Sequence, residues 1–399
     1  MALLSVAEAL ARVTEGLAPL EAESVALDDA SGRVLAEDLI AKLTQPPFDA
    51  SAMDGYAVRG ADIAKLPAIL KLIGESLAGC GFDGSIGANE AVRIFTGAPV
   101  PKGADSIVIQ EDTEQDATKV LVKAGAPGRH IRPRGQDFKK GGVLLSANTK
   151  LNSRSLMLAA AMNHAELPVR RKPKVAILAT GDEVVPPGSK LAPDQIVSSV
   201  PYGVAALVEA EGGEAMSLGI AKDDVESLVT LARSGSAADI LVTIGGASVG
   251  ERDLVATALR GEGLELDFWK IAMRPGKPML YGRMGNQRVL GLPGNPVSAI
   301  VCARVFLVPM LRCLLGLAAE SRTTEAVLGE ALEANGPREH YMRAVSDWTE
   351  TGERVVHPLA SQDSSLVAEL ARADCLIVRL VDAPAVPKGS RVQILPLDD

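Results

Sequence analysis

The sequence contains few aromatic residues, few cysteines and few histidines. Phe, Trp and Tyr make up 3% of 399 residues, so the hydrophobic cores have to be built from Ala, Val, Leu and Ile. The four cysteines include no C-x-x-C pair, and a chain of this length needs no disulfide staples, which together predict a reduced, cytoplasmic setting. The four histidines show no metal-ligand spacing, and no G-x-S-x-G or Cys/His signature supports a nucleophile triad.

Excess positive charge and long hydrophobic runs are also absent. The net charge is −9, from 41 basic and 50 acidic residues, which argues against a nucleic-acid binder but permits a local basic pocket for a small anion. The longest apolar run, AIVCARVFLVPML, is interrupted by Arg304 and Pro309, so we expect no membrane span. The N-terminal stretch predicts an amphipathic helix rather than a signal peptide, with one side formed by Leu3, Leu4, Ala7 and Leu10.

The remaining pattern predicts four domains. Residues 173–318 alternate strands and helices, which indicates βαβ units and a mostly parallel sheet. Residues 45–146 contain short β-like runs separated by Gly, Pro and Asp, as in a compact β-rich domain. The flanking segments 1–44 and 147–172 are expected to form an N-terminal helix and a two-segment linking domain, and residues 319–399 a small C-terminal β domain.

Three loops of the α/β segment are expected at one edge of the sheet. Right-handed crossovers place TGDE (180–183), GGASVGERD (245–253) and GLPGNP (291–296) together, beside the carboxyl ends of strands, where open α/β sheets bind ligands. In the first loop, Gly181 lets backbone N–H groups approach a ligand, while Asp182 and Glu183 after Thr180 could hold Mg²⁺ together with phosphate oxygens. A polar turn that caps a helix explains the same residues equally well.

The second loop predicts a phosphate cradle that opens onto a helix N-terminus. Its small residues are Gly245, Gly246, Ser248 and Gly250. Glu251 and Asp253 could serve there as ligands or simply complement the helix dipole. The loop is neither G-x-G-x-x-G nor a Walker A motif, so a nicotinamide or ordinary ATPase function has weak support.

A basic loop and a stiff loop could together form an oxyanion pocket. Lys270, Arg274 and Lys277 fall within eight residues, and prolines restrict the chain between them. In LGLPGNPVS, Pro293 and Pro296 fix the backbone. The side chains of Asn295 and Ser298 offer hydrogen-bond donors. A solvated basic turn and a tight structural turn remain the plain alternatives.

Together these stretches resemble the molybdopterin molybdenumtransferase family, the molybdenum insertases of molybdenum-cofactor biosynthesis, to which the gephyrin E domain belongs. The matching stretches occur in family order: PPFDASAMDGYAVR, FTGAPVPKGADSIVIQED, IRPRGQD, ATGDE, GGASVGERD, MRPGKPM and GLPGNPVSA. The resemblance implies an elongated four-domain protomer, with a molybdopterin-binding α/β domain and a barrel-like C-terminal domain, that forms a homodimer. It also implies insertion of molybdenum from molybdate into adenylylated molybdopterin, with Mg²⁺ or a similar cation, hydrolysis of the adenylate and release of AMP.

The resemblance also implies site residues. The β-rich domain would contribute Asp54, Thr96, Arg132 and Asp137, and the α/β domain the acids Glu183, Asp253 and either Asp223 or Asp224, of which we prefer Asp224. All of these acids except Asp223 are candidates for catalysis, and Glu183, Asp224 and Asp253 for holding the cation. The glycine-rich loops would bind substrate, and the anion pocket would be lined by Lys270, Arg274, Lys277, Pro293, Asn295, Pro296 and Ser298, with Arg343 of YMRA approaching from the last domain.

One departure from the family pattern concerns the basic loop. The family commonly has Lys-Pro-Gly-Lys-Pro, whereas this chain has Arg274 at the first cation, which keeps the charge and adds a planar fork for oxyanions. The SQDSS stretch (361–365) matches only loosely, so serine contacts there stay open.

Two other functions fit parts of the sequence. A molybdopterin adenylyltransferase-like enzyme would need only the α/β domain, and the β-domain motifs argue against it. A scaffold of the gephyrin type would need no intact acidic and basic loops. The expected partners are the small-molecule substrates, a second copy of the chain and, transiently, other cofactor-synthesis proteins, with neither nucleic acid nor a membrane.

Overall fold

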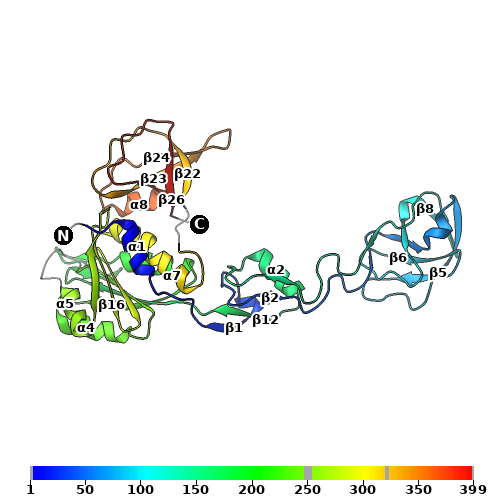
Figure 1. Ribbon diagram of the computed structural model, residues 1–399, viewed down its shortest axis with the longest axis horizontal. Helices are drawn as coiled ribbons and strands as arrows, with labels where there is room; N and C mark the ends of the chain where they lie inside the picture. Colours follow the sequence, from blue (N-terminus) through cyan, green and yellow to red (C-terminus); the bar gives the residue numbers. More distant parts are fainter. Residues whose placement is uncertain (1–2, 247–253, 320–322, 398–399) are drawn as a thin grey trace. The chain divides into compact units, whose positions relative to one another are not determined.

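The computed structural model describes residues 3–246, 254–319 and 323–397. The chain folds into two compact units, Ser24–Val169 and the combination of Met1–Glu23 with Arg170–Asp399. Figure 1 colours these segments along the sequence from blue to red. Each unit has cores of its own and is described separately.

The unit Ser24–Val169 contains a six-stranded sheet in the order β7-β4-β6-β5-β9-β8. The strands are β4 (Gly55–Val58), β5 (Ala68–Ser76), β6 (Glu90–Ile94), β7 (Ser106–Ile109), β8 (Thr113–Asp116) and β9 (Lys119–Val122). The predicted runs AVRIF, SIVIQ and KVLVK are β6, β7 and β9. The sheet surrounds small apolar cores, one of which contains Tyr56, Val58 and Val108.

The same unit has a second core built from two distant segments. Leu35 and Leu39 pack with Phe138, Leu151 and Met162. The elements around this core are β1 (Ala22–Ala26), η1 (Leu27–Asp29), β2 (Leu39–Ile40), β11 (Val143–Leu145), α2 (Ser153–Ala161) and β12 (Glu166–Arg170). The unit also contains β3 (Ala50–Ser51), η2 (Gly60–Ile63), η3 (Gln110–Asp112) and β10 (Ile131–Arg132).

The larger unit is organised around a second six-stranded sheet, ordered β16-β13-β17-β21-β20-β18. Its strands are β13 (Lys174–Thr180), β16 (Glu214–Ala221), β17 (Ile240–Ile244), β18 (Glu265–Lys270), β20 (Pro278–Met284) and β21 (Gln287–Leu292). Strands β16, β13, β17 and β21 are parallel to one another. Strand β20 is antiparallel to both of its neighbours, β21 and β18. The mostly parallel sheet is therefore confirmed, and the segment that we described only as a basic loop is a turn between two strands.

Helices cover both faces of this sheet. Residues of α1 (Val6–Thr14), α3 (Val200–Ala210), α6 (Pro296–Cys302) and α7 (Val308–Leu314) share one core with the sheet. Residues of α4 (Val225–Ser234) and α5 (Leu254–Gly261) share the other. Figure 1 shows α4 and α5 on one side of the sheet and α1 and α7 on the opposite side. The short strands β14 (Val184–Val185) and β15 (Ile196–Val197) pair in the loop after β13.

The buried face of α1 differs from the predicted one. Ser5 is the N-cap and forms a capping box with Glu8, so Leu3 and Leu4 precede the helix instead of lying on it. The buried side chains are Val6, Ala9 and Val13, whereas Ala7 is exposed and Leu10 is half-buried. The predicted side is right in part, because Leu4 and Leu10 pack against the core, and wrong for Ala7, which is exposed.

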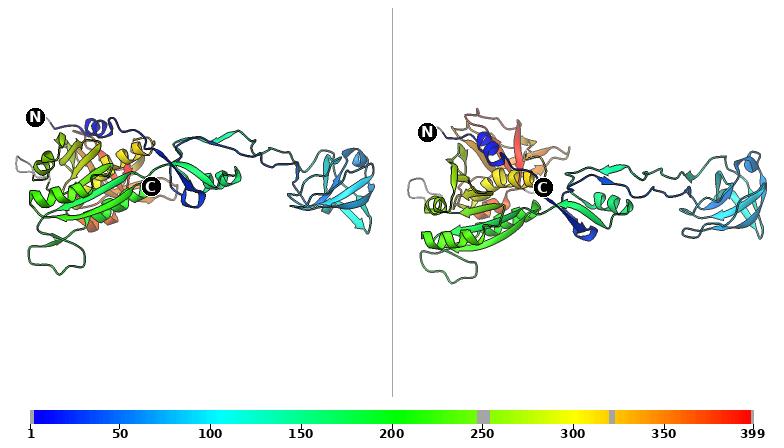
Figure 2. Two further views of the ribbon diagram at one scale, coloured as in Figure 1. Left: turned by 90° about the horizontal axis from the view of Figure 1, so that it is seen from below. Right: turned by 60° about the horizontal axis from the view of Figure 1, so that its bottom comes forward.

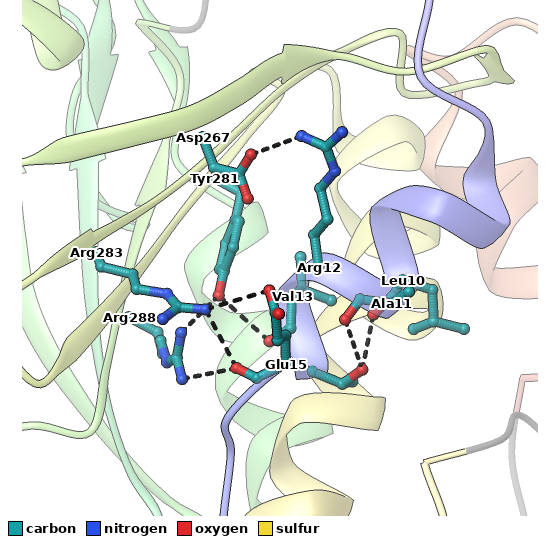
Figure 3. A network of polar contacts seen from close by, with 10 residues as sticks. Leu10, Ala11, Arg12, Val13, Glu15, Asp267, Tyr281, Arg283 and Arg288 are labelled. Carbon is teal, nitrogen blue, oxygen red and sulfur yellow. Dashed lines mark hydrogen bonds and ion pairs between the residues drawn. The ribbon is translucent and has the colours of Figure 1, made fainter.

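Polar contacts fasten α1 and the turn after it to the α/β sheet (Figure 3). Arg12 donates to Asp267 of β18 at 2.8 Å, and Arg283 and Arg288 donate to the carbonyl oxygen of Glu15 at 3.3 and 2.9 Å. The N-terminal helix, which we had grouped with the linking domain, thus packs against the α/β domain.

The apolar run that we expected to be interrupted forms one continuous helix. Pro296–Leu314 is long and apolar enough, by length and composition, to cross a membrane, but 83% of its apolar window is buried inside the protein, as in the core helix of a globular protein. Arg304 donates to Pro396 O and Glu211. Pro309 follows a π turn (η4, Ala303–Leu307), a wide turn that accommodates a missing N–H.

The C-terminal strands close into a barrel, coloured orange to red in Figure 2. They are β22 (Thr324–Leu328), β23 (Glu339–Trp348), β24 (Arg354–Pro358), β25 (Cys375–Arg379) and β26 (Arg391–Pro396), with helix α8 (Val367–Arg372) before β25. The order β23-β24-β22-β26-β25 closes because β25 also pairs with β23. Strand β19 (Met273–Arg274), from the basic loop of the α/β domain, adds to β23 on the outside.

Candidate active site

The loops predicted to meet at one edge of the α/β sheet do so in the structure. Gly245 has φ +89°, and a Cβ placed on it would lie 3.0 Å from both the carbonyl oxygen and the hydroxyl of Thr180. A Cβ on Gly294 would lie 3.6 Å from the Cα of Gly245. The turns after β13, β17 and β21 are thus in close backbone contact, which leaves no room for side chains between them.

Acidic side chains gather where β13 and β16 end. The backbone N–H of Asp223 donates to Asp182 at 3.2 Å, which joins the TGDE loop to the loop before α4. Asp224 is the N-cap of α4 and accepts from Ser227 N at 2.7 Å, so one of its oxygens has a structural task. Glu183 is exposed. Beside these loops lies a cavity of about 670 Å³ whose lining includes Asp182, Tyr202 and Lys222.

The donor set at this edge suits a divalent cation that keeps substrate oxygens among its ligands. Within residues 3–246, 254–319 and 323–397, no group of three His, Cys, Asp or Glu side chains is clustered as for a metal. Mg²⁺ needs only one or two carboxylates besides phosphate oxygens and water, so the exposed Glu183 and the second oxygen of Asp224 fit this role. Three predicted residues of the neighbouring loop lie outside the described residues: Ser248, Gly250 and Asp253.

The basic loop is held rigidly against helix α6. Gly276 has φ +108°, and a Cβ on it would lie 2.3 Å from the Sγ of Cys302. The Cys302 thiol is fully buried and points at the carbonyl of Gly276 at 3.9 Å, and burial raises its pKa far above the usual range. Arg274 and Lys277, on either side of Gly276, are exposed, and their side chains have no hydrogen bond or ion pair within the described residues. The loop therefore presents two free cations on a fixed backbone.

The start of α6 forms the second wall, and the C-terminal domain contributes to it. Ser298 is 6% exposed, and no described residue forms a hydrogen bond with its hydroxyl. Asn295 donates through its side chain to the Ser364 hydroxyl at 3.0 Å, and the carbonyl of Ser364 accepts from Val297 N at 3.1 Å. The side chain of Asn295, which we expected to donate to a ligand, therefore already donates within the protein.

Arg343 acts on the site through the same C-terminal loop. Its side chain is 1% exposed and donates to the carbonyls of Ser361, Asp363 and Leu366 at 3.0, 2.8 and 3.2 Å. The side chain of Gln362 pairs with the Arg343 backbone, donating at 3.0 Å and accepting at 2.9 Å. Arg343 thus shapes loop 361–366. Sequence reasoning missed the contact of Ser364 with α6 because the only sign of it in the sequence is the loosely matched SQDSS stretch.

Lys270 lies along a different cleft. A cavity of about 540 Å³ is lined by Leu3, Arg12, Arg260, Trp269 and Lys270, among others. The ammonium of Lys270 lies 5.7 Å from the centre of the Trp269 ring. Its predicted part in anion binding stays a prediction.

In the unit Ser24–Val169, Asp54 and Thr96 are joined directly. Asp54 accepts from both the backbone N–H and the hydroxyl of Thr96, each at 2.7 Å. These two hydrogen bonds, with a smaller effect from the Arg93 guanidinium, hold the pKa of Asp54 below its usual range. Arg93 stacks over the rings of Tyr56 and Phe95 at 4.9 and 5.0 Å. The result is an ionised carboxylate that two hydrogen bonds hold in place although it is only half-buried.

The other two predicted residues of this unit are exposed on one loop. Arg132 pairs with Ala50 in the short ladder of β10 and β3, and the backbone N–H of Asp137 donates to Gln45 O at 3.1 Å. No described residue pairs with the side chain of either, so both are available to a ligand.

These observations define a multidomain α/β protein with glycine-rich turns, exposed carboxylates and a basic loop around the α/β sheet. Comparisons with known families agree along the chain. Residues 4–163 match the MoeA N-terminal region (domain I and II), residues 176–313 a probable molybdopterin binding domain, and residues 325–397 the MoeA C-terminal region (domain IV).

Similar proteins cover the whole chain. The molybdopterin molybdenumtransferase of Haemophilus influenzae is 35% identical over 99% of both chains, and that of Bacillus subtilis is 33% identical over 98% of this chain and 94% of the relative. The solved structure of the molybdopterin biosynthesis MoeA protein from Pyrococcus horikoshii superposes with a TM-score of 0.85 at 30% identity, with 100% of both chains covered. The chain belongs to the molybdopterin molybdenumtransferase family and is a transferase of molybdenum cofactor biosynthesis.

Proposed function

We propose that the protein inserts molybdenum from molybdate into adenylylated molybdopterin, with hydrolysis of the adenylate and release of AMP. The observation that carries the proposal is the basic loop. Two free cations, Arg274 and Lys277, stand on a backbone packed against α6, and α6 itself begins with the buried hydroxyl of Ser298, which has no described partner. Fixed donors of this kind favour a small oxyanion such as molybdate because little freedom is lost on binding.

The glycine-rich edge supports the second half of the reaction. The close turns at Thr180, Gly245 and Gly294 carry glycine where a side chain would crowd the neighbouring turn, which would let the phosphates of an adenylylated pterin approach the main chain closely. The bulk of that substrate would lie along the 670 Å³ cavity beside Asp182. Cations and carboxylates occupy different loops, so they do not neutralise one another.

A divalent cation would be held by Glu183, Asp224 and Asp253, and it would polarise the phosphate bond that is hydrolysed. In the β-rich domain, Asp54 stays ionised and could orient water, and Asp137 could do the same. Thr96 would keep Asp54 in place, and Arg132 would bind a substrate oxygen. We further propose that the protein acts as a homodimer, for which sedimentation at several protein concentrations is the direct test.

The central experiment measures AMP released from adenylylated molybdopterin by the purified full chain with and without molybdate. We expect molybdate-dependent release that falls about a hundredfold or more in Lys277→Ala, the size of effect seen when one fixed donor to a developing charge is lost. Ser298→Ala should lower release in the same direction. Lys388→Ala, which removes an exposed charge from a turn of the C-terminal barrel, is the matched control and should keep full release.

The results distinguish the proposed reaction from the adenylyltransferase alternative. Molybdate-independent release, or full release by both Lys277→Ala and Ser298→Ala, would overturn the proposal. Consumption of ATP and molybdopterin by the full chain would favour the adenylyltransferase alternative instead.

A further inference from the structure

A row of basic side chains crosses three strands at one end of the C-terminal barrel. Arg274 of β19 is the register partner of His340 in β23, and His340 is the register partner of Arg379 in β25. Laterally paired residues project on the same face of a sheet with Cβ atoms about 5 Å apart. Arg338, two residues before His340, lies in the bend that leads into β23, and its guanidinium is one of the charges that act on the His340 ring.

His340 is the unusual member of this row. It is 7% exposed, and its ring has no hydrogen bond to any residue that the structure describes. Burial, together with the smaller effect of the guanidinium groups of Arg274, Arg338, Arg379 and Arg343, lowers the pKa of His340 to about 4. The ring is therefore neutral at neutral pH, and its one N–H donor has no described acceptor and is available to a ligand.

The arginines around His340 differ in what they bind. Arg379 is 5% exposed and donates to the carbonyls of Glu333 and Pro384, and Arg343 is used by the loop 361–366. Arg274 is exposed and Arg338 half-buried, and among the described residues no hydrogen bond or ion pair uses either guanidinium. The nearest acid in sequence, Glu339, accepts from the Tyr341 hydroxyl at 2.7 Å and projects on the opposite face of β23.

We propose that Arg274, Arg338 and His340 form a subsite for a tetrahedral dianion. Two guanidinium forks can each give paired hydrogen bonds to such an ion, and the neutral imidazole can give one more. Arg274 belongs to both this subsite and the basic loop, whereas Lys277 and Ser298 belong to the loop pocket alone. The bound group is either free molybdate or a phosphate ester, and both have the same shape and charge.

The role of this anion in the reaction rests on the proposed function. Binding of the anion at the subsite is measured without any turnover. The full chain is labelled with ¹³C at histidine Cε1 and titrated at neutral pH with inorganic phosphate or, separately, with molybdate, at ionic strength matched with chloride. The sequence has four histidines, and the spectrum of His340→Gln assigns the resonance of His340. We expect this resonance to shift saturably while those of His130, His164 and His357 stay in place.

Variants and the two anions sharpen the result. Arg338→Ala should weaken the titration about tenfold, equivalent to about 1.4 kcal/mol, whereas Arg391→Ala, an exposed arginine of β26 that pairs with Glu325, should leave it unchanged. Tighter binding of molybdate identifies a subsite for the free metal oxide, and tighter binding of phosphate identifies a subsite for the ester. An immobile His340 resonance with both ions, or an unaltered titration in Arg338→Ala, would refute the subsite. If it is refuted while molybdate-dependent AMP release persists, only this inference falls and the proposed function stands.

Discussion

The basic loop around Gly276 and the acidic turn around Asp54 fix their charged groups by different means. The basic loop is immobilised by long-range packing, because Gly276 presses on Cys302 and the adjoining strand β19 pairs with β23 of the C-terminal barrel. The acidic turn relies on two local hydrogen bonds from the exposed Thr96 to the half-buried Asp54. Substitutions in the first region should therefore disturb both stability and function, and substitutions in the second only function.

The largest effect should follow from Gly276→Ala. The new Cβ would collide with the Sγ of Cys302 at 2.3 Å, and the residue would have to keep φ +108°, so we expect a loss of about 2–4 kcal/mol in the free energy of unfolding together with loss of AMP release. Denaturant unfolding of the variant against the parent chain gives the measurement.

Two companion variants separate collision from backbone strain. Gly285 has φ +59° with open space around it, so Gly285→Ala should cost only about 1 kcal/mol. Cys302→Ala removes the colliding sulfur, and the double variant should be more stable than Gly276→Ala alone. Equal losses for Gly276→Ala and Gly285→Ala would show that packing on Cys302 does not hold the loop.

The pH dependence of stability tests the edge between the basic loop and the barrel. Because the pKa of His340 is lowered from 6.5 to about 4 in the folded protein, the unfolded chain binds more protons between these values. His340 should therefore have no effect on stability above pH 6.5 but should lower the free energy of unfolding, by roughly 1.4 kcal/mol per pH unit, as the pH falls through that window.

His340→Gln should flatten this part of the curve. The comparison needs urea unfolding at several pH values. An unchanged slope in His340→Gln would mean that His340 is not buried beside these arginines as the structure shows.

The smallest effect on stability is expected at the acidic turn. Thr96→Val removes the hydroxyl hydrogen bond but keeps the backbone one, so the pKa of Asp54 should rise part of the way toward its usual range. The carboxyl ¹³C shift of Asp54 across a pH titration reports this change. We expect the midpoint of thermal unfolding to stay within error while AMP release decreases. Thr113→Val, which removes a hydroxyl that donates to Gln110 O at 2.8 Å in the same unit, provides the control. A large drop in the midpoint would contradict the contrast between the two regions.

Sequence reasoning was most successful where short-range patterns decide the structure. The strands β13, β17 and β21, the helices α3 and α4 and the meeting of the glycine-rich turns followed from alternation and from handed crossovers. The pair Asp54 and Thr96 was predicted only through the family resemblance, because 42 residues separate them and nothing local connects them.

The misplaced features depend on contacts that no local pattern encodes. The face of α1 was wrong only in part: Ser5 caps the helix after Leu3 and Leu4, and Val6, Ala9 and Val13 form most of its buried side. The helix Pro296–Leu314 continues through Pro309 because a π turn makes room for it. Ser364 could not be placed at α6 from sequence, since its position depends on how the carbonyls around Arg343 fold the loop.

The ladder between β19 and β23 has a consequence for how such proteins can be divided. Two residues of the α/β segment, Met273 and Arg274, complete the edge of a barrel whose own strands begin some fifty residues later, at Thr324. A chain shortened to end before that barrel would leave Met273 and Arg274 without their neighbouring strand. The two domains are therefore not interchangeable modules, and a relative that lost the barrel would need a new way to shape the turn between β18 and β20.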